Sequence, residues 1–377
     1  MNTCIEILDY EQTENIISPL VFDFERIVYL YDEHHDYKNK RRTLIDLLNK
    51  KGITNIEFIE VKDHESDCFD RLVEKYPDAM FNLSNGSRTL LVQMARFCER
   101  TNQKCYTLNF QRKFFQNISG CDELKNKFKV PHIKIEDVIG LSAGEIIKTS
   151  HALPDLSNEL KQDMKRIIQL MNRDSSSWTR LLAQFAKSIR EDDESDTSVW
   201  LDVQSDAGQK KMLEGLSQIG VLQVFEHGKR LRVVFKNRTL MNMLKDSGAW
   251  LEYQSYLECL NSGYFDDVRI STVVDWNKMS RNHNDPTCEI DLIVIKNCIP
   301  VFVSCKMNKC TALDLYEIKL LSQKLGGTLG KAAVISKAPS LKDNEPLYLK
   351  AKELGICLIR EKEIESSQIA STLLDLI

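Results

Sequence analysis

The sequence predicts an α/β protein made of three parts. In the first third of the chain, short apolar runs that suit strands alternate with amphipathic runs that suit helices, which is the pattern of βαβ units and a mostly parallel sheet. In the last third, a strand pair within Cys288–Lys306 is followed by a helix and two more strands. A length of 377 residues favours two or three domains, and we place them at residues 1–148, 149–245 and 246–377.

The N-terminal elements follow one another in regular order. The expected strands are Cys4–Leu8, Arg26–Tyr31, Ile56–Val61, Met80–Leu83 and Cys105–Asn109. The expected helices between them are Thr13–Leu20, Lys40–Lys51, Cys68–Tyr76 and Arg88–Thr101. Ligands of such sheets bind beyond the carboxyl ends of the strands, so the polar segments that follow these strands are candidate binding loops.

One of these loops has a composition that suits phosphate binding. The run FNLSNGSRTLLVQMARFC goes from a strand through a small polar loop into a helix, and the loop consists of Ser84, Asn85, Gly86, Ser87 and Arg88. Glycine permits close backbone approach, and a helix N-terminus offers free N–H groups to an anion. A plain strand-to-helix turn with an N-cap serine has the same composition, so the loop alone leaves both interpretations open.

The middle of the chain predicts a helical connector. Amphipathic helices are expected at Leu156–Met171, Ser177–Ile189 and Lys210–Ile219, and a β-hairpin around Gly228 is expected within Val221–Phe235. Helices followed by a hairpin indicate a winged-helix-like module, which could contact nucleic acid, act as a spacer or form a dimer contact. The acidic run Arg190–Asp196 is expected to be a solvated linker.

The strand pair Cys288–Lys306 carries the most specific chemical pattern. Side chains alternate faces along a strand, so Glu289 and Asp291 share one face, and Ser304 and Lys306 share a face of the partner strand after a turn at Lys296–Pro300. Paired strands lie about 4.8 Å apart, so the acids and the lysine can converge. Carboxylates hold hard divalent cations, which activate water and neutralise a phosphate. Charged residues at the solvated end of a buried strand pair would give the same pattern.

The helices on either side of this hairpin add candidates. Trp250, Tyr253 and Leu257 fall on one face of the helix WLEYQSYLECL. Glu252 lies in its first turn, where a carboxylate is either a favourable charge at the helix dipole or an acid of the site. The helix after the hairpin, LDLYEIKLLSQKLGG, ends at Gly326-Gly327. Leu313, Tyr316, Leu320 and Gln323 are expected to form one stripe. Glu317 could face the active site, although a solvated helix position is favoured. Strands are expected at Lys331–Ser336 and Gly355–Ile359.

These motifs resemble those of known families. An acid on one hairpin strand followed by x-x-K on the other resembles the PD-(D/E)xK, or restriction-endonuclease-like, nucleases. E-x-D, then S-C-K and a helix ending in Gly-Gly, resembles more narrowly the nuclease domain of CRISPR-associated proteins activated by cyclic oligoadenylate. The run N-L-S-N-G-S resembles the loop of CARF domains, the Rossmann-like sensors of these molecules. The sequence departs from the nuclease pattern at Ser304, where an acid is usual.

The resemblance implies a role for each candidate residue of the nuclease part. Asp291 would be the principal ligand of Mn²⁺ or Mg²⁺, with Glu252 or Glu289 assisting and the backbone carbonyl of Cys305 completing the coordination. Lys306 would act at the phosphate. The implied activity is that of an endonuclease in type III CRISPR antiviral defence, acting on single-stranded DNA, RNA or both, with duplex DNA left open.

The resemblance also implies a sensor in the N-terminal part. Gln12 after the first strand and Asp32 after the second would line a cyclic oligoadenylate site together with the loop Ser84–Arg88. Cyclic tetraadenylate is the expected activator, and a homodimer with the ligand on its two-fold axis is the expected assembly. The expected architecture is therefore a Rossmann-like CARF domain, a winged-helix-like connector and a restriction-endonuclease-like α/β domain.

Composition narrows the function classes. The net charge is −4, so nucleic-acid binding would depend on a local patch. No apolar run approaches the roughly 18 residues of a membrane span, and the N-terminus lacks the features of a secretion signal, so a cytoplasmic protein is expected. Eleven cysteines without a CxxC pair argue against a zinc ribbon or a disulfide framework.

Two other function classes stay open at this point. The first is a ligand-responsive transcriptional regulator that binds DNA through the connector, for which the segment around Lys210 and Lys211 is a poor basic recognition helix. The second is a sensor that cleaves its own cyclic ligand. We favour the metal-dependent nuclease, because the acid pair and the lysine that it needs lie on facing strands.

Overall fold

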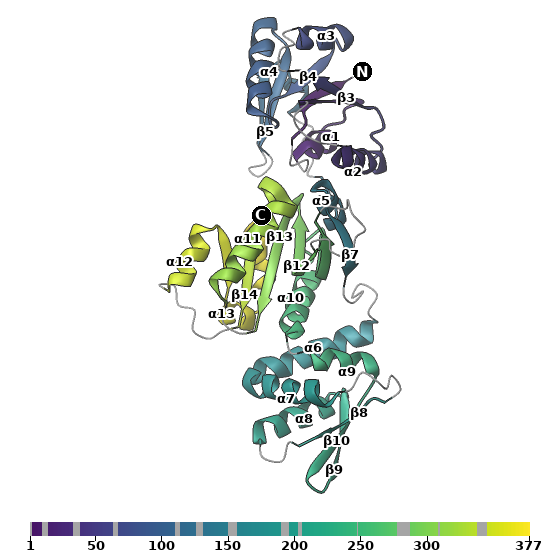
Figure 1. The fold of residues 1–377 in the computed structure, drawn as a ribbon, viewed down its shortest axis with the longest axis vertical. Helices are drawn as coiled ribbons and strands as arrows, with labels where there is room; N and C mark the ends of the chain where they lie inside the picture. Colours follow the sequence, from purple (N-terminus) through teal and green to yellow (C-terminus); the bar gives the residue numbers. More distant parts are fainter. Residues whose placement is uncertain are drawn as a thin grey trace.

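The computed structural model arranges the chain as three bodies stacked along one long axis (Figure 1). Two six-stranded sheets and one three-stranded sheet form their frames. The structure describes residues 2–9, 14–32, 38–62, 67–109, 114–125, 131–149, 157–189, 196–202, 206–246, 248–276, 287–307, 310–337 and 345–377. Within these ranges, none of the helices has the length and apolar character needed to cross a bilayer.

The N-terminal body is a doubly wound sheet in the order β3-β2-β1-β4-β5-β6. Every pair of neighbouring strands is parallel except β5 and β6. The strands are β1 (Thr3–Ile7), β2 (Arg26–Asp32), β3 (Ile56–Val61), β4 (Ala79–Asn82), β5 (Lys104–Asn109) and β6 (Phe114–Ser119), and the helices between them are α1 (Ile17–Val21), α2 (Lys38–Lys50), α3 (Cys68–Lys75) and α4 (Arg88–Thr101). The predicted parallel sheet is confirmed, and its strand order reverses between β1 and β4.

The middle body combines four helices with a small antiparallel sheet in the order β8-β10-β9. Its elements are α6 (Asn158–Arg173), α7 (Ser175–Ser188), β8 (Ser198–Leu201), α8 (Ala207–Gln218), β9 (Leu222–His227), β10 (Arg230–Phe235) and α9 (Arg238–Lys245). The expected hairpin turns at Gly228, whose φ is 58°, and the body has the predicted winged-helix-like character. Most of the expected acidic linker, residues 190–195, lies outside the described residues.

The C-terminal body is a mixed sheet in the order β15-β14-β13-β12-β11-β7. Its strands are β7 (Glu145–Thr149), β11 (Asp267–Asp275), β12 (Thr287–Lys296), β13 (Ile299–Lys306), β14 (Lys331–Ser336) and β15 (Ile356–Ile359), and its helices are α5 (Ile135–Leu141), α10 (Ala249–Ser262), α11 (Ala312–Gly326), α12 (Pro346–Glu353), α13 (Glu361–Glu365) and α14 (Ile369–Leu374). The edge strand β7 precedes the connector in sequence and pairs with β11 after it. The border that we place at residue 148 therefore falls inside a strand of this sheet.

The hairpin of β12 and β13 turns through only Asn297 and Cys298, with φ values of 52° and 65°. Positive φ at both central residues is the geometry that matches the twist of antiparallel strands. The turn is tighter than the expected segment Lys296–Pro300.

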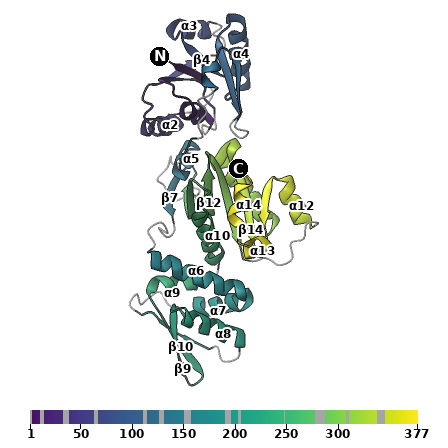
Figure 2. The same cartoon turned by 180° about the vertical axis from the view of Figure 1, so that it is seen from behind.

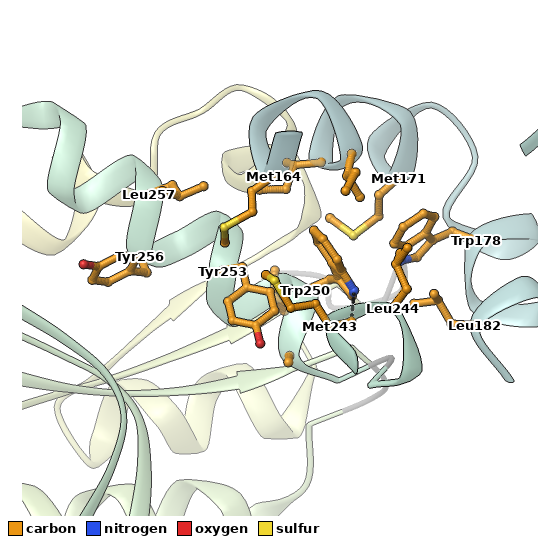
Figure 3. Close-up of a cluster of buried hydrophobic side chains, with 14 of the residues drawn as sticks. Met164, Met171, Trp178, Leu182, Met243, Leu244, Trp250, Tyr253, Tyr256 and Leu257 are labelled. Carbon is orange, nitrogen blue, oxygen red and sulfur yellow. Dashed lines mark hydrogen bonds between the residues drawn. The ribbon is translucent and has the colours of Figure 1, made fainter. Parts of the chain in front are cut away.

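Apolar packing joins the bodies to one another. One buried cluster runs from the connector into α10, where Trp178 and Trp250 meet edge to face with ring centroids 5.5 Å apart. Figure 3 shows this cluster, in which the indole N–H of Trp250 donates to the carbonyl of Met243 at 3.0 Å. A second cluster runs from the N-terminal sheet into the C-terminal body, and both junctions can be followed from behind in Figure 2.

The sequence prediction for the face of α11 is wrong. The expected stripe is exposed, with 76% of Leu313, 48% of Tyr316 and 55% of Leu320 accessible. The buried face consists of Leu315, Ile318, Leu321 and Leu325. By contrast, the expected face of α10 is confirmed, because Trp250, Tyr253 and Leu257 are buried.

Candidate functional site

The candidate active site forms where β12 and β13 part. The ladder between these strands ends at Leu292 and Val303. Beyond that point, the Asp291 carboxylate accepts the backbone N–H of Cys305 at 2.6 Å and the hydroxyl of Ser304 at 3.2 Å. A side chain thus takes the place of the next ladder bond. On the other side of β13, the carbonyl of Lys306 accepts the N–H of Lys337 at 3.0 Å, so the main-chain groups of Cys305 point towards Asp291.

The surroundings of Asp291 resist its negative charge. Burial raises the pKa of Asp291, and the nearby charge of Glu317 raises it further. The N–H of Cys305 and the charge of Lys306 offset this effect only in part. The carboxylate therefore sits in a place that favours an added positive charge.

Glu252 lies beside Asp291 and shares this property. Its carboxylate accepts the hydroxyl of Ser271 at 2.8 Å. Burial, followed by the charge of Asp291, raises the pKa of Glu252 to about 7. The position that the sequence suggested for Glu252, in the first turn of α10, is thus close to the acids of the hairpin.

Ser271 is held in an unusual conformation. Its neighbours Ile270 and Thr272 pair with Leu292 and Ile290 of β12, so Ser271 stands opposite Asp291. Its φ is 42°, a left-handed value that is uncommon for a residue with a side chain and that often marks a functional position. This kink turns the hydroxyl of Ser271 towards Glu252, a contact that the sequence did not indicate.

Lys306 points into a small polar cavity of about 50 Å³. Its ammonium pairs with the Asp314 carboxylate at 3.2 Å. Burial alone would lower the pKa of Lys306, but the hydrogen bond and charge of Asp314 raise it overall, helped by Asp291 and Glu317. The residues around the cavity include Glu289, Asp291, Ser304, Lys306, Asp314 and Glu317.

Two acids of α11 also line this cavity: Asp314, which the sequence did not indicate, and Glu317, for which the sequence favoured a solvated position over one at the active site. Asp314 also caps α11, where it accepts the backbone N–H and the hydroxyl of Thr311, so in the sequence it looks like an ordinary capping box. Glu317 is exposed, as the sequence predicts for a solvated position, but it stands at the rim of the cavity.

The carboxylates fit a hard divalent cation by their chemistry. Glu252 and Asp291 are both largely buried, and the charge of Asp291 raises the pKa of Glu252, so a cation between them would stabilise both. Oxygen ligands are those that Mg²⁺ and Mn²⁺ prefer. Among the residues that the structure describes, no group of three or more His, Cys, Asp and Glu side chains is placed to hold a metal, so the set depends on main-chain oxygen or water as well.

The sensor loop lies at the point where the order of the N-terminal sheet reverses. It follows β4, next to the end of β1, and such a switch point is where ligands of doubly wound sheets bind. Ser84 and Asn85 line a cavity of about 290 Å³ there, and Asn85 is buried. Gly86 has a φ of 107°, and a Cβ at this position would collide with the side chain of Ile7, so the fold requires a glycine here, and the close approach of this loop to a phosphate stays a prediction.

The remaining predicted sensor residues have different positions. The hydroxyl of Ser87 accepts the N–H of Leu90 at 3.4 Å as the N-cap of α4. Arg88 is exposed and Asp32 is buried at the end of β2, and neither is among the residues around the cavity. Gln12 lies outside the described residues.

A buried polar network of the N-terminal body lies next to this cavity. Glu6 is fully buried in β1, and burial raises its pKa to about 8. The side-chain amides of Asn82 and Asn15 donate to it. Asn82 also lines the cavity. No sequence pattern indicates this network, because one glutamate in the strand TCIEI looks like ordinary alternation.

The C-terminal body supplies one wall of the same cavity. Thr328 and Leu329, in the turn after α11, are among its lining residues, and the hydroxyl of Thr328 donates to Glu14. The first turn of α11 holds Asp314 against Lys306. One helix therefore runs from the candidate active site to the sensor cavity.

Comparison with known proteins shows the fold. No family model matches the chain, and no curated protein matches it. Protein VC1899 from Vibrio cholerae has a similar structure, with a TM-score of 0.79 and 18% identity over 99% of this chain and 97% of that one. Can2 from Sulfobacillus thermosulfidooxidans, in complex with cyclic tetra-adenylate, matches with a TM-score of 0.69 and 13% identity over 99% and 96% of the two chains. The predicted α/β fold class is therefore confirmed over almost the whole chain.

Proposed function

We propose that the protein is a divalent-metal-dependent endonuclease activated by a cyclic oligoadenylate. The observation that carries this proposal is the convergence of Glu252, Asp291 and Lys306 where β12 and β13 part. A second observation supports the activator: the cavity at the switch point is polar, and Can2, which has a similar fold, is described in complex with cyclic tetra-adenylate.

Each residue has a defined task in the proposed reaction. Glu252, Asp291 and the carbonyl of Cys305 would hold Mn²⁺ or Mg²⁺, with Glu289 at the edge of the cavity as a further oxygen donor. The bound cation activates water and neutralises charge on the phosphate. The ammonium of Lys306, kept charged and oriented by Asp314, stabilises the negative charge that develops on the phosphate oxygens.

The sensor and the assembly complete the proposal. Ser84, Asn85 and Gly86 would receive the adenylate phosphates, with Ser87 and Arg88 at the start of α4 and with Gln12 and Asp32 from neighbouring strand ends. A ring of repeated adenylates has rotational symmetry, so a homodimer can present this loop twice to one ligand. We assign the sensor to the N-terminal body within residues 1–148, the connector to residues 149–245 and the nuclease to residues 246–377, with β7 from the first segment completing the nuclease sheet.

The proposed function is tested by a cleavage assay. Purified protein is incubated with labelled single-stranded DNA, single-stranded RNA and plasmid, with and without cyclic tetraadenylate and Mn²⁺. We expect cleavage that requires both additions and that is lost in Asp291→Ala and Lys306→Ala. Lys296→Ala is the matched control, because Lys296 is another half-buried lysine of the same hairpin and pairs with Asp266 at 2.8 Å. Full activity of both active-site variants would refute the assignment.

A further inference from the structure

The small sheet of the connector exposes an aromatic and cationic row. In the register of β8, β10 and β9, Arg232 stands directly opposite Trp200 on one side and Phe225 on the other. The three side chains therefore share the solvent face of the sheet, while Leu231 and Val233 on either side of Arg232 are buried in the connector. The row is an exposed guanidinium flanked by two aromatic rings.

This exposure is unusual for such large rings. Trp200 is 48% and Phe225 46% accessible, whereas Trp178 and Trp250 are fully buried. The ring of His227 meets Trp200 edge to face at a centroid distance of 5.4 Å, which limits the freedom of the indole. Within the described part of the chain, Arg232 makes no ion pair, whereas the neighbouring Arg230 lies 3.5 Å from Asp202. Among the described residues, the row therefore presents a cation without an ion pair and two exposed ring faces.

The charge of the rest of the protein makes such a surface necessary for a nucleic-acid substrate. The net charge is −4, and the candidate active site places Glu289, Asp291, Asp314 and Glu317 around the cavity of Lys306, with Glu252 near Asp291. This site repels a polyanion before any cation is bound, so substrate affinity must come from elsewhere. The connector adjoins the site, because Lys337 next to β14 donates to Asn172 of α6 at 2.9 Å.

We propose that the row Trp200–Arg232–Phe225 binds a single-stranded nucleic acid by stacking bases on its two rings, with the guanidinium of Arg232 between them on the backbone. The rings lie on the outer strands of a three-stranded sheet, about 10 Å apart by ordinary strand spacing, so each can take its own base. Sheet faces with exposed aromatics recognise single strands in this way. Bases of a duplex are already stacked on each other and offer no such faces.

This inference deepens the proposed function, since the strand that it binds would be the nuclease substrate. The sheet lies at the end of the molecule farthest from the N-terminal body (Figure 1). That position leaves its face open to a long chain that continues towards the active site.

Binding is measured on the full-length protein in the presence of a chelator, so that cleavage cannot interfere. The probe is a fluorescein-labelled twenty-nucleotide oligo-thymidine, followed by anisotropy, with the same strand in a duplex for comparison. Stacking on an aromatic side chain is worth about 1–3 kcal/mol per base, so Trp200→Ala and Phe225→Ala should each weaken binding roughly 5- to 100-fold. Phe114→Ala is the matched control, because Phe114 is 49% exposed on the N-terminal sheet, and it should bind as wild type.

Two further readouts separate stacking from a general loss of fold. Trp200 is the most exposed tryptophan of the described chain, so the oligonucleotide should quench tryptophan fluorescence in wild type and not in Trp200→Phe, which keeps a stacking ring. Arg232→Gln should reduce the slope of log affinity against log salt by about 0.7, the value for one phosphate contact on a single strand.

The possible outcomes distinguish this inference from the proposed function. Wild-type affinity in both Trp200→Ala and Phe225→Ala would overturn the inference. A change in the molar mass of these variants in light scattering, without a change in binding, would also overturn it and would make the row a contact between copies. If the row binds oligonucleotide but no substrate is cleaved under any condition, the surface stands and the nuclease assignment fails. Cleavage with unaltered KM and unaltered binding in both variants would leave the nuclease and remove the row.

Discussion

Replacing Glu252 by glutamine should stabilise the protein in the absence of metal. The pKa of Glu252 rises from 4.5 to about 7 in the folded chain, so folding favours its neutral form. As the pH rises from 4.5 towards 7, the unfolded chain loses this proton while the folded chain keeps it, and the folded state loses stability. Each pH unit of difference corresponds to about 1.4 kcal/mol, so the loss at pH 8.5 is about 3 kcal/mol. Glutamine has the same shape, can still accept the hydroxyl of Ser271, and carries no charge.

Calorimetry with a chelator should show this difference directly. At pH 8.5, Glu252→Gln should melt roughly 4 °C above wild type for a chain of 377 residues, and at pH 4.5 the two should melt together. Glu317→Gln, which removes an exposed carboxylate at the rim of the same cavity, should change stability by less than about 0.5 kcal/mol at either pH. Saturating Mn²⁺ should then stabilise wild type more than Glu252→Gln, because a ligand stabilises the form that binds it better.

One melting result would contradict this prediction for Glu252. If Glu252→Gln melts at or below the temperature of wild type at pH 8.5 without metal, the charged carboxylate of Glu252 does not destabilise the folded protein. Neither burial nor the charge of Asp291 would then raise the pKa of Glu252, and the pairing of the two acids as ligands of one cation would lose its support.

Three further predictions follow from other contacts. Gly86→Val should weaken the binding of cyclic tetraadenylate more than tenfold in calorimetry, because the valine side chain would collide with Ile7. Gly52→Val, at a similarly positive φ but with open space around it, should bind normally. Equal affinities of the two variants would place the ligand elsewhere. Trp250→Ala should cost about 3–5 kcal/mol in denaturant unfolding, because it empties a fully buried site, and a cost below 1 kcal/mol would contradict the packing described. Ser271→Ala removes the donor to Glu252, so the onset of Mn²⁺ binding should move up by about one pH unit, and an unchanged onset would argue against that contact.

The elements that local patterns predict well are those whose partners are near in sequence. The N-terminal strands and helices alternate with clear periodicity, so both their positions and the parallel sheet could be predicted. The strand Phe114–Ser119 was not predicted. Its residues are only half-buried or exposed, and apolar and polar residue types do not alternate along it. Nothing near Glu145–Thr149 indicates its pairing with β11, since that partner lies more than a hundred residues further along the chain.

In the candidate site too, local patterns predict some features and miss others. The period-two pattern was enough to bring Asp291 and Lys306 to one end of a hairpin. Periodicity could not choose the buried face of α11, because Leu313, Tyr316 and Leu320 form one apolar stripe and Leu315, Ile318 and Leu321 form another. The contact of Ser271 with Glu252 depends on a left-handed residue inside a strand, which no pattern of residue types specifies.

The helix α11 gives the protein a mechanical property. Its 15 residues span roughly 22 Å at 1.5 Å per residue, with Asp314 of the lysine pair at one end and Thr328 of the sensor cavity just past the other. A helix that packs on a dense core is stiff along its axis. It therefore moves as one rigid unit and is not compressed. Under the proposed function, a ligand that contacts Thr328 would move that end by sliding or tilting the whole helix, and Asp314 would move with it. If the proposed function holds, the length of this helix would set the distance between the proposed ligand cavity and Lys306, the partner of Asp314.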